Sequence, residues 1–440
     1  MRVKNIITGN TAIAALALVS APANAQASDA DVTALKTELA ELKAKLAALT
    51  EKVEDNSKQA NTASAPEVKW KGAPEIKDEE GWSFKPRGRI QYDFGTVDAP
   101  SSINDPGLGF ANEARRIRLG ASGKIPGGFG YKLEADFSGG DVNLTDAFFS
   151  YQDKSLTLTL GQQNPFQGLE ELSSSNDTSF IERAAYTDAF SFERNVGISA
   201  QYKTGPVLLQ AGVFTDNINA LGNDANNSIG FDARIVAMPK IGGAQAHFGA
   251  SYHYRDLGDA VTSRRYRQRP LVHFTDTRFI NTGNIGGAKS EMNYGLEAAV
   301  ISGRFHAAAE THWLKLRRTG ALPDPTFFGG SIEAGLFLTD DTRGYKNGVF
   351  KGAKVSNPVG KGGLGAFQFN IRYDHLDLVD AGIVGGIQDS YQASLIWTPI
   401  NYVRFMINYA KMDYDMATIL AAGSGDYNAD ILAGRFQLSF

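Results

Sequence analysis

Cationic side chains recur at every second position in two short stretches of this 440-residue chain. Arg87 is followed by Arg89, and Arg116 by Arg118, with one uncharged residue inside each pair. Comparable positions in other stretches carry Lys132, Arg372, Arg404 and Arg435. The planar guanidinium of arginine suits paired hydrogen bonds to the oxygens of phosphate or carboxylate. If these side chains share one water-filled space, they would attract and bind small anions.

The charge balance on this polar side differs from that of the whole chain. The chain has 44 Lys and Arg against 48 Asp and Glu, a net charge of −4. In the clearest stretches, the eight cations named above accompany only four acidic residues, Asp93, Glu134, Asp136 and Asp374. This excess predicts that the enclosed space prefers anions. The alternative is that the arginines pair with these carboxylates and merely brace a protein wall.

The same stretches alternate between polar and apolar residues, the pattern of a β-strand whose two faces meet different environments. They run to about ten residues, the length of a tilted transmembrane strand. Aromatic residues near the ends of the apolar sides fit an interfacial girdle: Tyr92, Phe94, Tyr373, Trp397 and Tyr409. A half-buried soluble sheet also alternates, but a packed soluble core would not accept the charged side without partners.

Sixteen such segments can be counted, which predicts an all-β fold: a 16-stranded antiparallel transmembrane β-barrel, wide enough for an aqueous channel. An even count places both ends of the barrel on the periplasmic side. Connections 161–194, 255–289 and 414–429 are then extracellular, whereas 340–365 conflicts because it is periplasmic yet long. The expected strands are 84–95, 114–123, 130–138, 143–151, 156–163, 195–202, 207–214, 229–237, 244–255, 290–300, 304–316, 327–339, 366–378, 388–398, 402–413 and 430–440.

The connection 161–194 has its own chemistry. It follows the fifth expected strand and carries three consecutive serines, Ser173, Ser174 and Ser175. In porins, a long third loop folds into the lumen and sets the constriction. Serine hydroxyls and backbone N–H groups there could donate hydrogen bonds to an anion. The alternative is an ordinary mobile extracellular loop.

Three further regions precede the barrel, which we assign to residues 83–440. Residues 1–25 have the basic start, apolar centre and A-x-A site of a secretory signal peptide. Residues 26–56 predict a coiled-coil oligomerisation segment, and the polar residues 57–82 predict a linker. The coiled-coil seam residues alternate in spacing between three and four: Val32, Leu35, Leu39, Leu42, Leu46, Leu49 and Val53. Leu at both seam positions leaves the oligomer open, although a trimer fits a porin.

Five spaced motifs resemble the phosphate-selective porin O and P family, and the resemblance covers residues 83–440. The motifs are KPRGRIQYD (85–93), RRIRLG (115–120) with KLEADF (132–137), SSND (174–177) with FIER (180–183), PLVHFTDT (270–277), and FLT (337–339) with TRGY (342–345).

The resemblance implies a trimeric, sixteen-stranded porin that passes phosphate or similar anions through an Arg- and Lys-lined channel. The matching wall positions are Arg87, Arg89, Arg115, Arg116 and Arg118. The matching constriction residues are Ser173, Ser174 and Ser175. Many members carry a Lys between the Gly and Pro that open this loop, whereas this chain has Gln162, Gln163 and Asn164. The departure favours anion or general permeation over strict phosphate selectivity.

The sequence argues against an enzyme and against a nucleic-acid partner. None of the six histidines has the GxSxG, HExxH or comparable spacing of a catalytic motif around it, and a mildly acidic chain is a poor nucleic-acid ligand. The chain has no cysteine, which excludes disulfides and thiolate metal sites. We expect no cofactor or metal, outer-membrane lipid and further copies of the chain as partners, inorganic anions as permeants, and a Gram-negative outer-membrane location. A general diffusion porin and an envelope-tethering barrel are the alternatives.

Overall fold

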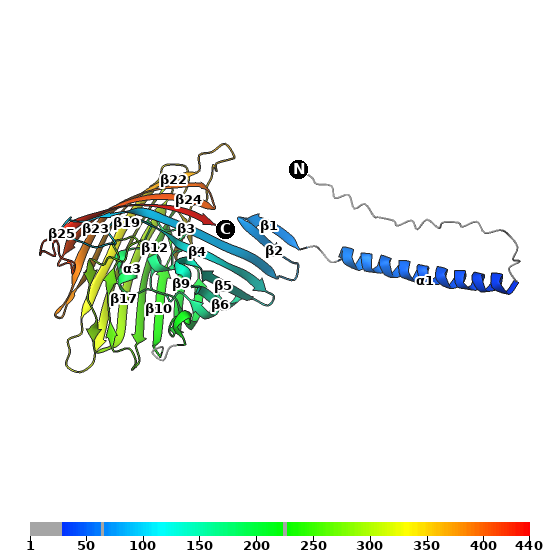
Figure 1. Ribbon diagram of the computed structural model, residues 1–440, viewed down its shortest axis with the longest axis horizontal. Helices are drawn as coiled ribbons and strands as arrows, with labels where there is room; N and C mark the ends of the chain where they lie inside the picture. The colour runs from blue at the N-terminus through cyan, green and yellow to red at the C-terminus, as the bar shows by residue number, and fades with distance from the viewer. Residues whose placement is uncertain (1–28, 63–65, 223–226) are drawn as a thin grey trace. The chain divides into compact units, whose positions relative to one another are not determined.

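The computed structural model describes residues 29–62, 66–222 and 227–440 (Figure 1). The chain divides into two compact units, residues 1–65 and 66–440, and the signal peptide expected at 1–25 lies outside the described residues. In the first unit, helix α1 (Asp29–Thr62) contains neither Gly nor Pro and is rich in strong helix formers. Its seven seam residues are 40–68% exposed. No helix in the described ranges is both long and apolar enough to span a membrane.

The second unit is a closed antiparallel barrel of sixteen strands, as the sequence predicts. Each expected segment overlaps one strand, consecutive strands pair with one another, and the last pairs with the first. The barrel strands are β3 (Ser83–Asp98), β4 (Gly109–Ile125), β5 (Phe129–Asp136), β6 (Asn143–Asp153), β7 (Leu156–Gln163), β8 (Asn195–Thr204), β9 (Val207–Phe214), β10 (Ile229–Ala237), β12 (Ala244–Asp256), β17 (Ala288–Ser302), β18 (Phe305–Arg318), β19 (Thr326–Phe337), β22 (Ala366–Asp380), β23 (Ile383–Ile400), β24 (Val403–Asp415) and β25 (Tyr427–Ser439).

Shorter elements extend the edges of this sheet or lie in the connections between barrel strands. They are β1 (Glu67–Lys71), β2 (Ala73–Lys77), β11 (Lys240–Ile241), β13 (Ser263–Arg264), β14 (Arg267–Gln268), β15 (Ile280–Asn281), β16 (Ile285–Gly286), β20 (Gly344–Lys346), β21 (Val349–Lys351), the helices α2 (Leu169–Leu172) and α3 (Ala185–Ala189), and the 3₁₀ turns η1 (Ser138–Gly140) and η2 (Ile218–Ala220).

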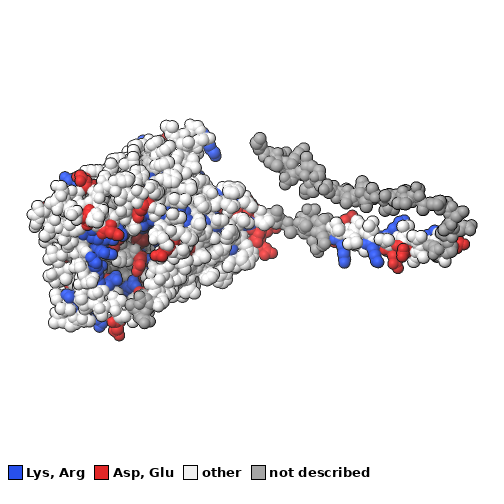
Figure 2. All heavy atoms as spheres, in the orientation of Figure 1, with Lys and Arg blue, Asp and Glu red and all other residues white. Residues whose placement is uncertain are grey.

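The period-two pattern separates the two faces of the wall. On β3, Gln91 and Asp93 are fully buried inside the barrel, whereas Tyr92 and Phe94 are exposed on its outer face. Figure 2 shows the same division, because most of the visible barrel surface carries no charged residue. Lys, Arg, Asp and Glu atoms instead gather together in one area of that face. The outer wall is therefore apolar and the interior polar, as lipid outside and water inside require.

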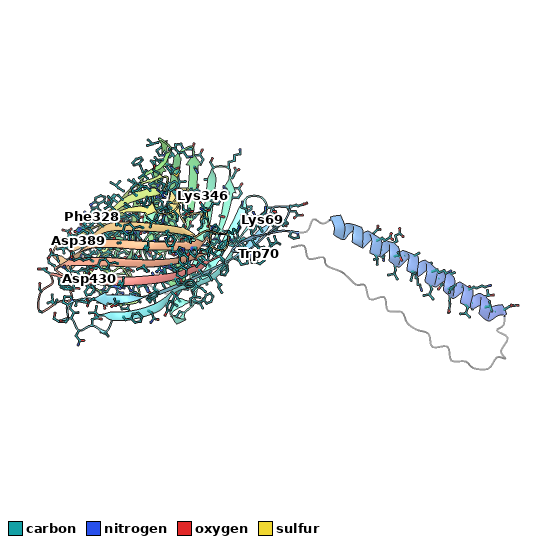
Figure 3. All side chains as sticks on the ribbon, turned by 90° about the horizontal axis from the view of Figure 1, so that it is seen from above. Lys69, Trp70, Phe328, Lys346, Asp389 and Asp430 are labelled. Carbon is teal, nitrogen blue, oxygen red and sulfur yellow. The ribbon has the colours of Figure 1, made fainter. Side chains whose placement is uncertain are left out.

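A hairpin occupies part of the stretch in which the sequence indicates a linker. β2 pairs with the start of β3, beyond the point where Phe440 exchanges backbone hydrogen bonds with Gly88. Because β25 ends there, the first residues of β3 would otherwise have no neighbouring strand on that edge. The β1–β2 turn sits against the C-terminal residue and the β23–β24 turn, since a Cβ on Gly72 would lie 3.1 Å from the Phe440 Cα and 2.6 Å from the Tyr402 ring. In Figure 3, Lys69 and Trp70 of this hairpin lie at one end of the unit, and Phe328, Asp389 and Asp430 at the other.

Segment 338–365 contains the connection 340–365, whose length conflicts with the short periplasmic turns that the sequence predicts. The other connections at this end are short, but segment 338–365 forms the β20–β21 hairpin and contacts luminal side chains. Arg234 on β10 donates to the Gly348 carbonyl oxygen at 2.8 Å, and His247 on β12 lies 2.6 Å from the Tyr345 hydroxyl. The segment is long because it folds into the barrel, and the wall needs no additional strand.

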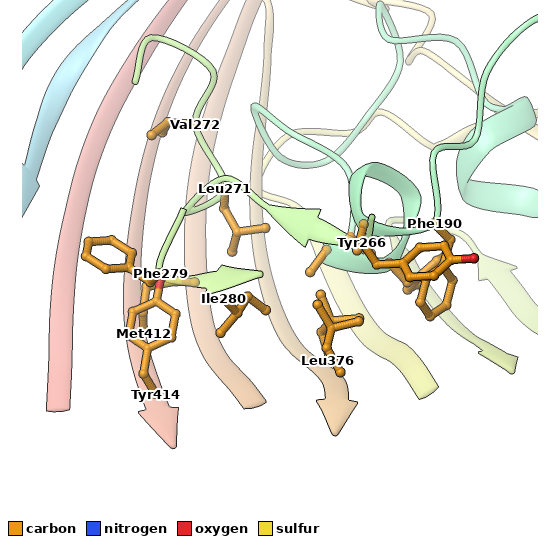
Figure 4. Close-up of a cluster of buried hydrophobic side chains, with 14 of the residues drawn as sticks. Phe190, Tyr266, Leu271, Val272, Phe279, Ile280, Leu376, Met412 and Tyr414 are labelled. Carbon is orange, nitrogen blue, oxygen red and sulfur yellow. The ribbon is translucent and has the colours of Figure 1, made fainter. Parts of the chain in front are cut away.

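Two loops from the opposite end also enter the barrel. Loop 164–194 joins β7 to β8, and loop 257–287 joins β12 to β17. Their apolar side chains form one buried cluster with inward-facing residues of β18, β19 and β22 to β25, and Figure 4 shows the loop residue Phe279 beside the wall residues Met412 and Tyr414. This buried cluster holds both loops on one side of the interior, so the polar space lies toward β3 to β7.

Candidate functional site

Arginines of the late strands hold the backbone of loop 164–194. Arg404 donates to the Asn176 carbonyl oxygen at 3.0 Å and to that of Thr178 at 2.6 Å. Arg435 donates to the Ile181 carbonyl oxygen at 2.7 Å. The loop has little secondary structure, so its buried carbonyl groups need such partners. The guanidinium groups therefore fix a loop that crosses the interior.

Two arginines of the late strands, Arg435 and Arg372, are also paired with buried carboxylates. Arg435 lies 2.6 Å from both carboxylate oxygens of Asp93, and neither side chain is exposed. Arg372 donates to Glu170 and Glu333 at 2.9 Å each and lies over the Phe180 ring. Of the sequence-derived candidates, Arg372 and Arg435 thus lie in buried ion-pair networks, away from open space.

A β-bulge brings two consecutive arginines to the interior. The register of β4 against β3 passes from Gln91↔Arg116 to Tyr92↔Ala114, which leaves Arg115 as the extra residue. In a regular strand, neighbouring side chains point to opposite faces, but a bulge re-aims one of them. Arg115 and Arg116 consequently line the same cavity.

The environments of these two arginines differ. Arg115 makes a two-pronged contact with Glu182, at 2.8 and 3.2 Å. Although burial opposes the charge, Arg115 holds the pKa of the Glu182 carboxyl well below its usual range. Arg116 donates instead to the neutral Gln91 amide oxygen at 2.8 Å. Arg116 therefore keeps more of its charge available to a solute.

The remaining wall cations fall into the same two groups. Arg118 pairs with Asp136 at 2.7 Å, and Lys132 pairs with Asp146 at 2.6 Å. Arg87 and Arg89 donate only to hydroxyls, those of Ser122 and Ser175, at 2.7 and 2.6 Å. Of the nine cationic wall residues that the sequence singles out, all of them in the described ranges, those without a carboxylate ion pair are Arg87, Arg89, Arg116 and Arg404.

Two cavities occupy the polar space. The loop-side cavity, about 550 Å³, is lined by β3 to β7, by loop 164–194 and by residues 268–273 of loop 257–287. The turn-side cavity, about 380 Å³, is lined by β3, β5, β24 and β25, by the tip of loop 164–194 and by segment 338–365. The three serines lie at this tip: Ser175 accepts from Arg89, Ser173 accepts from the Phe350 backbone N–H at 3.3 Å, and Ser174 lines both cavities.

The two cavities differ in charge. Among the described residues, the turn-side cavity has six cations and two carboxylates: Arg87, Arg89, Lys132, Arg343, Lys351 and Arg404 against Glu134 and Asp177. The loop-side cavity has eight cations and six carboxylates: Arg89, Arg115, Arg116, Arg118, Lys132, Arg183, Arg194 and Arg269 against Glu134, Asp146, Glu171, Glu182, Asp188 and Glu193. Both are net positive, and the turn-side cavity is more so.

Several of these cations were absent from the sequence-derived set. Arg183, Arg194, Arg269, Arg343 and Lys351 lie in connections, where no alternation reveals which side chains face the interior. The signal that could have found two of them is motif membership, since Arg183 ends FIER and Arg343 lies in TRGY.

Comparisons with known proteins agree with this architecture. An uncharacterized protein of Caulobacter vibrioides is 49% identical over 393 residues, covering 87% of this chain and 79% of its own. An anion-selective porin from Comamonas acidovorans (13% identity, 82% and 100% coverage) and the trimer form of OmpT from Vibrio cholerae (10% identity, 82% and 100% coverage) each share the fold with a TM-score of 0.51. The family model for phosphate-selective porin O and P matches residues 84–440. The chain therefore belongs to the phosphate-selective porin O and P family.

Proposed function

We propose that this outer-membrane porin passes small anions, phosphate or polyphosphate among them, by passive diffusion through the loop-side and turn-side cavities. The observation that carries the proposal is the excess of cations in both cavities, which reaches six against two on the turn side. In a confined space with low-dielectric walls, fixed charge raises the local concentration of the opposite ion. Loop 164–194 narrows the route, because it crosses the interior and places Ser174 between the cavities.

The arginines without carboxylate partners are the proposed anion contacts. Arg87, Arg89 and Arg116 can form paired bonds to phosphate oxygens without first leaving an ion pair. Arg115, Arg118 and Lys132 contribute to the field, although each is partly neutralised by a carboxylate. Arg372, Arg404 and Arg435 support the channel by positioning loop 164–194.

Strict phosphate selectivity is not part of the proposal. At the start of loop 164–194, Gln162 and Gln163 are buried neutral amides, and Gln163 accepts a hydrogen bond from Ser199 at 2.7 Å. A neutral amide cannot supply the charge that a lysine would bring to a phosphate. We expect preference for anions as a class, with phosphate as one permeant. The anion-selective porin of similar fold supports this choice.

The proposed assembly is a homotrimer. The trimer form of OmpT shows that a barrel of this fold can assemble as three copies. Helix α1 adds a seam of seven exposed apolar residues, which a second and third copy would cover.

Reversal potential in a KCl gradient tests the function. The purified protein in a planar bilayer should conduct and should favour chloride, and Arg116→Gln should reduce that preference because it removes a charge from the loop-side cavity. Arg304→Gln is the matched control, since Arg304 is an exposed turn residue and lines neither cavity. Insertion without conductance, or preference for potassium, would refute the proposal.

A further inference from the structure

The two cavities meet at four residues. Arg89 on β3, Lys132 and Glu134 on β5, and Ser174 on loop 164–194 line both the loop-side and the turn-side cavity. A solute that moves from one cavity to the other must pass the residues they share. We call these four residues the neck.

Glu134 is the only acidic member of the neck, and its position is well defined. Its side chain points inward on the same face of β5 as Lys132 and is 5% exposed. Its carboxylate lies 3.7 Å from the Lys132 ammonium and 3.4 Å from the Arg118 guanidinium, and accepts from the Thr145 hydroxyl at 3.1 Å. The β5 register therefore places one negative charge at the point that every permeating ion must pass.

The other charges around the neck are mostly positive. Arg89 donates to Ser175, and its Nε atom is buried without a hydrogen-bond partner. Arg118 approaches from β4, and Asp146 from β6 holds Lys132. Glu134 thus offsets the cations that an anion would use at the neck, and it engages two of them directly.

We propose that the Glu134 carboxylate limits the anion selectivity of this channel. The inference rests on the proposed anion-porin function and adds the residue that sets its degree. Charge at a narrow passage acts more strongly than charge on a wide wall, because the ion cannot keep its distance or its full hydration shell. Neutralising Glu134 would leave Lys132 and Arg118 paired with Asp146 and Asp136, but it would remove the one negative charge of the neck, so that Arg89 and Lys132 would be its only charged members.

The test is the isosteric substitution Glu134→Gln in the full-length protein, measured by reversal potential in a KCl gradient. One unit charge at about 4 Å in a water-like dielectric changes the permeability of each ion roughly fivefold, in opposite directions for anion and cation, so the anion-to-cation permeability ratio should rise by up to roughly 25-fold. Asp136→Asn is the matched control. Asp136 lies two residues further on the same face of β5 and pairs with Arg118 at 2.7 Å, but it lines neither cavity. Its substitution removes the same charge and should shift the ratio much less.

The outcomes separate the two proposals. Anion preference in the unmodified protein with no change in Glu134→Gln, or with equal shifts in both variants, would overturn the role of Glu134 and leave the anion porin standing. Cation preference in the unmodified protein would overturn the function itself.

If Glu134→Gln fails to fold, Ser174→Cys tests the neck instead, because the chain has no other cysteine. An alkyl thiosulfonate reagent converts the introduced thiolate into a mixed disulfide and releases a sulfinate. An anionic thioalkyl group attached in this way should lower anion selectivity and conductance, and a cationic one should raise selectivity. Equal effects of the two reagents, or none, would contradict the neck assignment.

Discussion

The luminal arginines differ according to their immediate partners. Arg435 and Arg372 are each surrounded by carboxylates and loop carbonyl groups and are almost fully buried. Arg87, Arg89 and Arg116 face hydroxyls or an amide and border open space. A buried guanidinium is tolerated only when its charge and N–H groups are satisfied, so the first group is structural. The second group keeps charge that a solute can reach.

The buried pair between Arg435 and Asp93 gives a stability prediction. It joins β25 to β3 at the seam that closes the barrel. Arg435→Met should lower the free energy of unfolding by about 3–5 kcal/mol, because it leaves the Asp93 carboxylate buried and unpaired. Urea unfolding of the barrel in lipid vesicles measures the change. The double variant Arg435→Met/Asp93→Asn should recover part of the loss, and a double variant as unstable as the sum of the two single ones would contradict the pairing.

Glu171 gives a pH prediction. Burial raises the pKa of this loop-side carboxyl above its ordinary value of 4.5, although Arg183 opposes the shift. As pH falls from about 7 to about 5, Glu171 takes up a proton before an ordinary glutamate does. The loop-side cavity then loses negative charge, so anion selectivity should rise. Glu193, whose pKa burial raises in the same way, contributes to the same rise.

Reversal potentials at the two pH values check this. Glu171→Gln should flatten part of the rise, and Glu171→Gln/Glu193→Gln should flatten more of it. Glu182→Gln is the control. Because the pKa of Glu182 stays well below its usual range despite burial, with Arg115 holding its charge, Glu182 remains ionised throughout. A rise that survives the double substitution unchanged would show that other groups cause it.

At the scale of elements, the tip of loop 164–194 is held from two directions. Arg404 from the wall binds the carbonyl oxygens of Asn176 and Thr178, and Arg343 from segment 338–365 binds that of Asp177. Two guanidinium groups therefore clamp three consecutive carbonyls. The loop comes from one end of the barrel and segment 338–365 from the other, so the position of the neck depends on both.

Arg343→Gln tests this clamp. Losing the contact with Asp177 should let the loop tip move, so single-channel conductance should increase and the open-channel current should become noisier. Arg304→Gln is again a suitable control, because Arg304 is half exposed and pairs only weakly with Asp340 at 3.9 Å. Unchanged conductance and noise in Arg343→Gln would mean that Arg404 and Gln437 hold the tip by themselves.

At the scale of the molecule, the two units differ in what their exposed apolar side chains are expected to contact. The barrel turns its apolar side chains toward lipid, whereas α1 exposes an apolar seam on a helix whose other residues are mostly polar or Ala. Such a seam is covered when helices from several copies associate. The helix would then tie protomers together independently of the barrels.

The absence of cysteine allows a direct test of helix association. Leu42→Cys, at a seam position, should form a disulfide between protomers under mild oxidation in cells, because seam residues of neighbouring helices face one another. Ala44→Cys lies on the opposite face of α1 and should cross-link far less. Non-reducing electrophoresis reads out both variants. Equal cross-linking of the two would contradict the coiled coil.

How much the sequence revealed depends on the range of the interactions. Alternation in β3 or β5 follows from neighbours within one strand, so the sixteen strands and the inward direction of Arg89, Lys132 and Glu134 could be predicted. The seam of α1 is equally local. Arg115 facing inward could not be derived in this way, because it depends on a bulge that only pairing with β3 creates. The resemblance to the family nevertheless named it.

The arrangement inside the barrel is a property of the tertiary structure alone. Segment 338–365 reads as an oversized connection, and nothing in its own residues shows that it turns inward to meet loop 164–194. Glu182 is distant in sequence from Arg115 and Arg435, yet it neutralises part of both. Contacts of this kind depend on how separate loops pack together in one enclosed volume. The hydrophobic and polar pattern within a single segment does not contain that information. The sequence by itself therefore determined a barrel with a charged interior, and the fold decided which charges a solute can reach.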